Sequence, residues 1–410
     1  MNCLPITVGT RRRVTRWAAL SLSAIALPLA APVAGQSARA HPAASRTVEH
    51  WGSLSGGVIP IRAVNTILSP APVRLPGPVT EVATSNSTEY ALLADGRVYA
   101  WGLGSHGQLG DGATSNSFTT PVRVRFPAGV KIASLPINVM PYDTALAVDT
   151  TGHAWGWGIN GGGELCLGNR HQHLVPVELP FRHVTTVAGA FSHAVYDAAG
   201  QVWACGLGKL GVLGNGTTDS SFVPVKVRGL GPAAHVVALV AAFANAGALL
   251  ADGRYLDWGT NGLGQLGTGS AAKLSDVPVT VRLPAKVTQA AQGGSAPGNG
   301  QTLVLLANGA LYAWGADGQG QLGDGKTTPQ FAPELITPPS GVTYRLLASS
   351  GATSYGVTPA GDVYAWGAGR VGQIGNGTTT GSPAPVKVAS HATGISGTAF
   401  DVVISTRPHR

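Results

Sequence analysis

A seventeen-residue phrase that occurs six times limits the possible folds of this chain more than any other feature. It first reads GRVYAWGLGSHGQLGDG, from Gly96 to Gly112, and a Pro-containing segment such as Pro121-Val122-Arg123-Val124 follows each copy. The later copies begin at Gly152, Gly200, Gly253, Gly309 and Gly361. Repeats of this length predict a propeller or a solenoid, in which each repeat buries its apolar faces against its neighbours.

The number of repeats is seven. Equivalent positions in the six phrases are held by Trp101, Trp157, Cys205, Trp258, Trp314 and Trp366, which lie 56, 48, 53, 56 and 52 residues apart. Trp51-Gly52 precedes Trp101 by 50 residues and marks one further unit.

Each unit has the pattern of short antiparallel strands. An apolar-rich run such as Tyr90 to Ala94 leads into Asp95-Gly96, and Asp252-Gly253 and Asn308-Gly309 occupy the same place in other units. These dipeptides favour the positive φ of a two-residue hairpin turn. Charged residues make up only 11% of the chain, against about 25% in typical proteins, while glycine (58) and proline (28) are abundant. We therefore predict four strands in each unit, which is one propeller blade.

The two ends of the chain complement each other. The segment from Val388 to Thr406 has the early strands of a unit without a Trp-Gly strand, and Thr47 to Gly52 has a Trp-Gly strand without early strands. Pairing them would complete the seventh blade and remove exposed sheet edges. The predicted fold is an all-β, seven-bladed β-propeller over residues 41–410, closed by its N- and C-terminal strands.

The succession of Trp-Gly, Gly-Gln-Leu-Gly and Pro-Val resembles the regulator of chromosome condensation repeat family, over about residues 45 to 406. The resemblance implies a seven-bladed propeller. Cys205 departs from it by replacing the blade tryptophan, and Cys166-Leu167 interrupts the second phrase. The family's namesake is a nuclear exchange factor for a small GTPase and a nucleosome binder. The family also includes secreted bacterial propellers, some of which inhibit β-lactamases through one loop-lined face.

Residues 1–40 have the layout of a secretory signal peptide. Four arginines stand at positions 11, 12, 13 and 16, an apolar stretch runs from Trp17 to about Val33, and Ala38-Arg39-Ala40 gives a small-x-small end. Arg12-Arg13 also fits a twin-arginine signal, so the export route stays open. We predict a secreted or extracellular protein after cleavage near Ala40.

The net charge and the hydropathy of the chain limit the classes of partner that it can bind. The net charge is +8, but residues 1–40 hold five of the 27 basic residues and none of the 19 acidic ones, which leaves +3 for the rest. A nucleic-acid partner would require a denser basic face. After Ala40 no run of about 18 apolar residues could span a bilayer. We expect a monomer that binds no nucleic acid and does not span a membrane. Its expected partner is a protein or a cell-envelope component.

The candidate binding residues come from two adjacent columns inside the phrase that vary while the flanking glycines are kept. Such loop tips recur on one rim of a propeller, where binding residues commonly lie. The residues predicted to form the recognition surface are His106, Lys209, Gln319 and Arg370. The alternative is that they are tolerant surface positions. A second candidate is the segment from Gly52 to Pro70, with Ile59, Pro60 and Ile61.

Other repeated residues have structural interpretations. The regular recurrence of Trp51, Trp101, Trp157, Trp258, Trp314 and Trp366 predicts packing between blades. Gln108, Gln265, Gln321 and Gln373 are expected to bind backbone groups in their own tight loops. Cys166 and Cys205 could form a disulfide or pack as free thiols, and the sequence leaves both possibilities open.

Neither a cofactor nor a metal is predicted. Glycine strings such as Gly102-x-Gly104-x-x-Gly107 match a dinucleotide fingerprint, but a Pro-containing strand follows them where that motif needs a helix. Cys166, His171 and His173 lie close together in sequence, but their spacing fits no recognised zinc pattern.

The sequence thus favours an exported, non-catalytic binding scaffold, of which an inhibitor of a secreted enzyme is one specific form. One alternative is a hydrolase or lyase with its site at the channel mouth. Guanyl-nucleotide exchange, by family analogy, is another.

Overall fold

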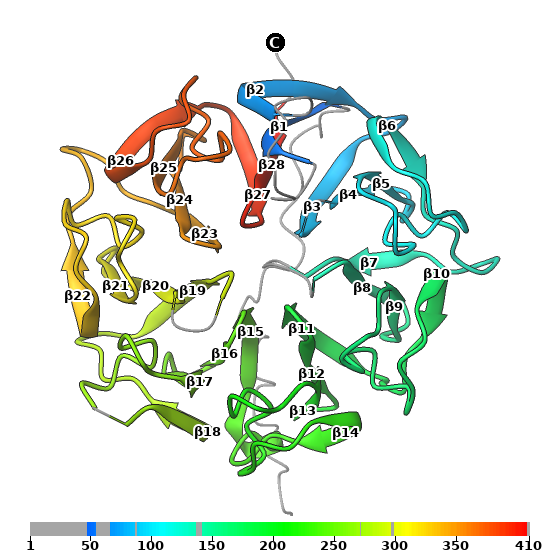
Figure 1. Cartoon of the computed structure of the whole chain (residues 1–410), viewed down its shortest axis with the longest axis horizontal. Helices are drawn as coiled ribbons and strands as arrows, with labels where there is room; N and C mark the ends of the chain where they lie inside the picture. Colours follow the sequence, from blue (N-terminus) through cyan, green and yellow to red (C-terminus); the bar gives the residue numbers. More distant parts are fainter. Residues whose placement is uncertain are drawn as a thin grey trace, which may run out of the picture. The chain divides into compact units, whose positions relative to one another are not determined.

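The structure, a computed structural model, describes residues 47–54, 66–86, 88–136, 142–270, 272–296 and 299–407. In these residues 28 strands form seven antiparallel sheets of four strands, and the only helical turn is a 3-10 turn at Pro232–Ala234. The sheets of the unit Gln36–Arg410 surround a central axis as blades (Figure 1). The prediction of seven four-stranded blades is confirmed. The predicted signal peptide, residues 1–40, lies outside the described residues.

Blades 1 to 6 follow the chain, and each runs from its innermost to its outermost strand (Figure 1). Blade 1 contains β3 (Val79–Ser85), β4 (Thr88–Leu93), β5 (Val98–Gly102) and β6 (Ser117–Arg123); blade 2 contains β7 (Ile132–Ser134), β8 (Thr144–Asp149), β9 (Ala154–Gly158) and β10 (His173–Glu178). Blade 3 contains β11 (Val184–Ala190), β12 (His193–Ala198), β13 (Gln201–Gly206) and β14 (Ser221–Lys226).

The next three blades have the same organisation. Blade 4 contains β15 (Val236–Ala242), β16 (Asn245–Leu250), β17 (Tyr255–Thr260) and β18 (Leu274–Thr280); blade 5 contains β19 (Val287–Gly293), β20 (Gln301–Leu306), β21 (Leu311–Gly315) and β22 (Gln330–Ile336). Blade 6 contains β23 (Leu346–Ser350), β24 (Thr353–Val357), β25 (Val363–Gly367) and β26 (Ser382–Ala389).

Blade 7 is built from both ends of the described chain. Its strand order is β27 (Ala392–Gly397), β28 (Asp401–Thr406), β1 (Thr47–Ser53) and β2 (Thr66–Arg74). β1 and β28 are antiparallel, with Val48 opposite Ser405 and Gly52 opposite Asp401. The predicted closure by terminal strands is therefore confirmed. Residues 66–70, expected to be part of a loop, instead begin β2, while Ile59 to Ile61 lie outside the described residues.

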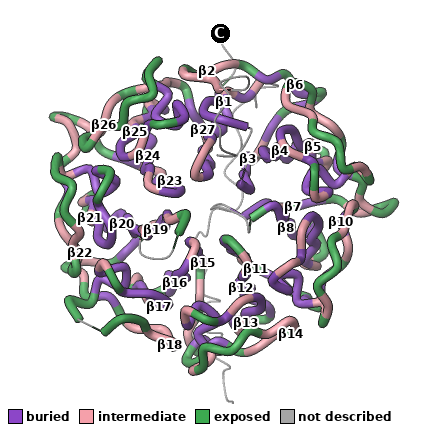
Figure 2. The backbone as a smooth tube through the Cα atoms, in the orientation of Figure 1, coloured by how far each residue is buried: buried purple, intermediate pink, exposed green. Residues whose placement is uncertain are grey.

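Burial follows the order of strands within a blade. The second strands, such as β4 and β12, are buried along their whole length, whereas outer strands such as β6 and β14 are mostly half-buried or exposed (Figure 2). Every outer strand contains a proline, which cannot donate a backbone hydrogen bond and so discourages another chain from pairing with the edge.

Neighbouring blades are joined by a repeated tryptophan contact. The Trp157 indole of blade 2 donates a hydrogen bond to the Gln108 carbonyl of blade 1, at 2.9 Å. A side chain at Gly110 would place its Cβ 2.8 Å from the Trp157 Nε1, so the position must stay glycine. Equivalent bonds join Trp258 to Val212, Trp314 to Gln265, Trp366 to Gln321 and Trp51 to Gln373.

Two of the seven boundaries differ. Between blades 7 and 1, the buried Trp101 meets the His50 ring edge-on, with centroids 6.5 Å apart. Between blades 2 and 3, a disulfide joins Cys166, which stands where Gly110 stands in blade 1, to Cys205, which stands in the tryptophan position. The Cys205 sulfur also lies 3.3 Å from the Glu164 carbonyl, the acceptor that a tryptophan would use. A covalent bond therefore replaces one glycine–tryptophan contact.

The glutamines of the phrase act within their own loops. The Gln108 Oε1 accepts a hydrogen bond from the His106 backbone N–H at 2.8 Å, and Gln265, Gln321 and Gln373 repeat this bond. Blade 2 has Glu164 instead, whose carboxylate accepts from the Gly162 N–H at 2.8 Å and from the Thr144 hydroxyl at 3.1 Å. Burial raises the pKa of Glu164 to about 7.

Exchange of this carboxyl group for an amide should change how stability depends on pH. Because the pKa of Glu164 is raised on folding, the folded state retains the proton while the unfolded state loses it. The free energy of unfolding therefore falls between about pH 4.5 and pH 7. We expect Glu164→Gln to remove about 3 kcal/mol of this fall.

The measurement is urea unfolding of both proteins from pH 4 to pH 8. Their difference isolates Glu164 from other buried acids that titrate in the same range, such as Asp317, whose pKa burial also raises to about 7. Parallel curves for the two proteins would contradict the assignment.

Candidate binding face

At one end of every blade lie two loops that differ in their distance from the propeller axis. In blade 1, Ser85 pairs with Thr88, Thr88 with Gly102, and Gly102 with Ser117. The turn from the first to the second strand (the inner turn) therefore lies at the same end as the loop from the third to the fourth strand (the phrase loop). Inner strands surround the axis in Figure 1, so the inner turns encircle one end of this axis, which we call the channel mouth. Inner turns and phrase loops together form the channel-mouth face.

All four predicted recognition residues lie on phrase loops of this face. Lys209, Gln319 and Arg370 are exposed, and the His106 side chain is 43% exposed. Within the described residues, no hydrogen bond or ion pair joins any two of the four. They are spread over blades 1, 3, 5 and 6 and do not form one cluster.

His106 is the one that reaches an inner turn. Its Nδ1 lies 2.9 Å from Asp143 Oδ2, and Asp143 Oδ1 accepts a hydrogen bond from the Asn86 amide, also at 2.9 Å. Asp143 is buried and belongs to blade 2, whereas His106 and Asn86 belong to blade 1. These contacts tie the phrase loop of one blade to the inner turn of the next.

Aromatic side chains gather on the inner turns. Tyr142, Phe191 and Phe243 belong to blades 2, 3 and 4 in succession, and the ring centroids are 6.1 Å apart for Tyr142–Phe191 and 4.0 Å for Phe191–Phe243. Tyr142 is 45% exposed and Phe191 is 37% exposed. Phe400, on the inner turn of blade 7, is half-buried.

These rings border a pocket of about 100 Å³ at the channel mouth. Inner-turn residues and the adjoining ends of the first strands, from all seven blades, line it. They are Asn86, Tyr142, Ala190, Phe191, Ala241, Ala242, Phe243, Gln292, Gly293, Gly294, Ser295, Ser350, Gly351, Thr398, Ala399 and Phe400. Among these described residues there is no Asp, Glu, His, Lys or Arg. The pocket combines aromatic and aliphatic surface with neutral polar groups.

The sequence prediction missed this pocket because it followed the phrase loops, where the repeats are easiest to align. The sequence did contain a signal for the pocket, in the inner turns, which are less regular than the phrase loops. Aromatic residues make up only 6% of the chain, yet Tyr142, Phe191, Phe243 and Phe400 all stand one or two positions before a second strand.

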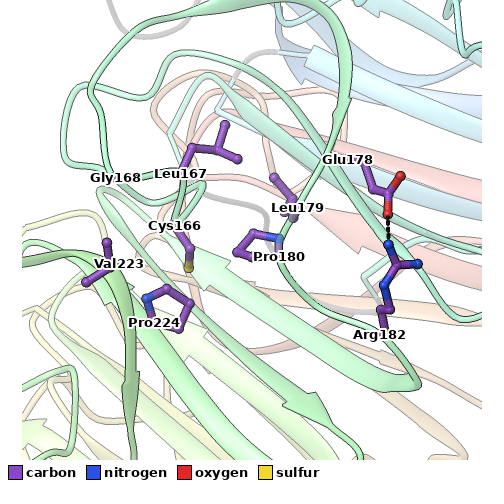
Figure 3. A pocket seen from close by; sticks show the side chains of 9 residues that line it. All are labelled: Cys166, Leu167, Gly168, Glu178, Leu179, Pro180, Arg182, Val223 and Pro224. Atoms are coloured by element: carbon purple, nitrogen blue, oxygen red, sulfur yellow. Dashed lines mark ion pairs between the residues drawn. The ribbon is translucent and has the colours of Figure 1, made fainter.

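A wider hollow of about 490 Å³ lies over the disulfide, at the boundary of blades 2 and 3. Figure 3 shows Cys166 between Leu179-Pro180 on one side and Val223-Pro224 on the other. An ion pair joins Glu178 to Arg182, with 3.0 Å between nitrogen and oxygen. None of the four predicted recognition residues lines this hollow.

The described part of the chain has neither a cluster of metal-binding side chains nor a helix that could span a membrane. It contains no group of three or more His, Cys, Asp or Glu side chains placed to hold a metal ion. Nor does that part contain a helix long and apolar enough to cross a membrane.

Known repeats match several blades directly. The regulator of chromosome condensation (RCC1) repeat matches residues 95–135, 199–241, 308–354 and 360–399, and a second form of this repeat matches residues 79–108.

Curated relatives share the repeat region. The chain is 28% identical over 297 residues to the ultraviolet-B receptor UVR8 of Arabidopsis thaliana, and the aligned region covers 70% of this chain and 65% of the receptor. It is 28% identical over 345 residues to the human E3 ubiquitin-protein ligase HERC2, and the aligned region covers 83% of this chain and 7% of the ligase. The chain thus spans less than two thirds of either relative.

Solved structures show the same fold. Human WBSCR16 superposes with a TM-score of 0.76 at 19% identity, covering 89% of this chain and all of that one. Prp20p of Saccharomyces cerevisiae superposes with a TM-score of 0.75 at 20% identity, covering 91% of this chain and 93% of that one. The Prp20p structure was described together with its binding to Gsp1p and histones.

Proposed function

Because the chain is a propeller of the regulator of chromosome condensation repeat family, we propose that it is an exported, non-catalytic scaffold that binds a partner protein through its channel-mouth face. Inhibition of a secreted enzyme is the specific form of this function that suits the compartment. The observation that carries the proposal is the ring of partly exposed aromatic side chains on inner turns, with the variable phrase loops outside it. Aromatic anchors inside a polar rim are typical of protein interfaces.

The chemistry of the pocket supports binding over catalysis. Its described lining contains no carboxylate, imidazole or ammonium group, and proton transfer usually requires one of these. Prp20p, which has the same fold, binds proteins.

Export is supported by the leader-like sequence of residues 1–40. The Cys166–Cys205 bond suits that compartment, since disulfides persist in oxidising surroundings.

The partner should be recoverable by affinity capture. The bait is residues 41–410, presented to the secreted and envelope fraction of the organism that makes the protein. We expect one stoichiometric protein by mass spectrometry. Changing His106, Lys209, Gln319 and Arg370 together to alanine should weaken its binding at least tenfold, which corresponds to about 1.4 kcal/mol or more.

The matched control changes Arg97 and Arg254 to alanine. Arg254 is exposed and Arg97 is half-buried, and both lie at the turn from the second to the third strand, the opposite end of their blades. Affinity should survive the control. Unchanged binding by the quadruple variant would refute the role of the phrase loops, and recovery of the leader-bearing chain only inside cells would refute export.

A further inference from the structure

The channel-mouth pocket has an apolar side and a polar side. Tyr142, Phe191 and Phe243, from the contiguous blades 2 to 4, supply the aromatic side. Asn86 of blade 1, Gln292 of blade 5 and Ser350 of blade 6 come from the remainder of the ring. An occupant that fills the pocket therefore meets an aromatic wall from blades 2 to 4 and, from the other blades, amide and hydroxyl groups together with the Phe400 ring of blade 7.

Each of the three polar residues has an atom without a partner. Asn86 Oδ1, Gln292 Oε1 and Ser350 Oγ are buried and make no hydrogen bond within the described structure. The residues are 7%, 1% and 1% exposed. A buried polar atom without a partner is costly, and three around one pocket indicate a ligand that supplies the missing bonds.

The orientation of the amides defines what that ligand must offer. The Asn86 amide donates to Asp143 and the Gln292 amide donates to Asp257, both at 2.9 Å. Their N–H groups are thus engaged, and the unpartnered atoms are carbonyl oxygens, which accept. The Ser350 hydroxyl can donate or accept. The ligand must present at least two hydrogen-bond donors.

The lining also selects against charge. No Asp, Glu, His, Lys or Arg among the described residues lines the pocket, and an ion buried without a counter-charge is strongly disfavoured. A volume of about 100 Å³ is well below the roughly 300 Å³ or more of typical ligand pockets, so the pocket admits one small ring and not an extended ligand.

We infer that this pocket binds a neutral saccharide ring. The apolar C–H face of the sugar packs on Tyr142, Phe191 and Phe243, and hydroxyl groups along its edge donate to Asn86 and Gln292 and exchange a bond with Ser350. This site shares its aromatic side chains with the proposed protein interface, but saccharide binding can be measured without the partner protein.

The test uses residues 41–410 with glucose, galactose, mannose and N-acetylglucosamine, each as its neutral methyl glycoside. Saturation-transfer NMR detects binding and calorimetric titration measures it. At least one glycoside should bind with a dissociation constant between about 0.1 and 10 mM, as expected for a ligand of this size in a small pocket. Saturation should be strongest on the ring C–H protons.

Two variants and one control distinguish binding in the pocket from nonspecific binding to exposed aromatic side chains. Phe191→Ala should weaken binding at least fivefold. Phe331 lies on the outer strand β22 and is about as exposed as Phe191, so Phe331→Ala is the control and should leave binding unchanged. Ser350→Ala removes an unpartnered buried hydroxyl, so it should weaken sugar binding about fivefold while the melting temperature stays the same or rises. A merely structural serine would not separate these two readouts.

Three results would overturn the inference. One is the absence of binding by every glycoside at 20 mM. Another is binding that survives both Phe191→Ala and Ser350→Ala. The last is binding of a neutral peptide probe, N-acetyl-leucine amide, in place of all sugars, which would assign the pocket to a side chain of the partner protein. The first two results do not bear on capture of the partner protein, and the third would make the pocket part of the partner's binding site.

Discussion

Replacing Cys166 and Cys205 together by alanine is expected to lower the free energy of unfolding by about 4 kcal/mol, the chain-entropy value for a loop of this length. The bond closes a loop between residues 39 apart and stands at the one boundary in the described structure where two cysteines replace glycine and tryptophan. The alanine variant loses both the cross-link and any substitute for the indole hydrogen bond. Urea unfolding without reductant measures the difference.

A second variant asks whether the disulfide substitutes for the tryptophan contact. Cys166→Gly with Cys205→Trp restores the pair found at five other boundaries, and the Glu164 carbonyl is already in place as acceptor. Cys166 has a φ of +59°, which glycine adopts more easily than alanine. This variant should recover part of the lost stability. Equal stability of the disulfide-bonded wild type and the alanine variant, both measured without reductant, would contradict a stabilising role.

Trp314→Ala should cost about 4 kcal/mol, the usual range for removal of a large buried aromatic side chain. Trp314 is fully buried, packs edge-on against Tyr255 with centroids 5.9 Å apart, and donates to the Gln265 carbonyl of blade 4 at 2.9 Å. The variant leaves a cavity between blades 4 and 5 and deprives that carbonyl of its donor. Thermal and urea unfolding both report the loss.

Trp203→Ala provides the matched control for this tryptophan. Trp203 is half-buried and lies 5.5 Å from the Lys226 ammonium, so its removal should cost about 1 to 2 kcal/mol. Trp314→Phe keeps most of the volume without the N–H and should fall between the two. If Trp203→Ala were as destabilising as Trp314→Ala, the blade contact would not be the main source of the effect.

The fold could be predicted because its information is local and repeated. Asp95-Gly96 and its equivalents fix hairpins, and the constant spacing of Trp-Gly fixes the number of blades. Closure by β1 and β28 followed from the strands missing at each end. The partnership of Cys166 with Cys205 could not be settled from the sequence, because it depends on the register of two blades: the phrase turn of one meets the third strand of the next.

The binding face was only partly accessible to sequence reasoning. His106, Lys209, Gln319 and Arg370 were found as variable positions between constant glycines, and nothing yet tests their role. The pocket depends on side chains from seven separate inner turns, whose lengths differ between blades. Asn86 and Gln292 become notable only when the structure shows that their carbonyl oxygens have no partner.

Closure of the ring by both ends has a consequence for the order in which the protein matures. Blade 7 joins Thr47 to Thr406, which are 359 residues apart in sequence, through a hydrogen bond between them. β1 can pair with β2 early, but in a chain made from its N-terminus the other edge of β1, which pairs with β28, stays open until the last strand has been made. Contacts so distant in sequence form slowly. The exposed edge of β1 is a hazard for that interval. For a chain that crosses a membrane before folding, late closure is an advantage, because no stable ring can form while the C-terminus is still missing.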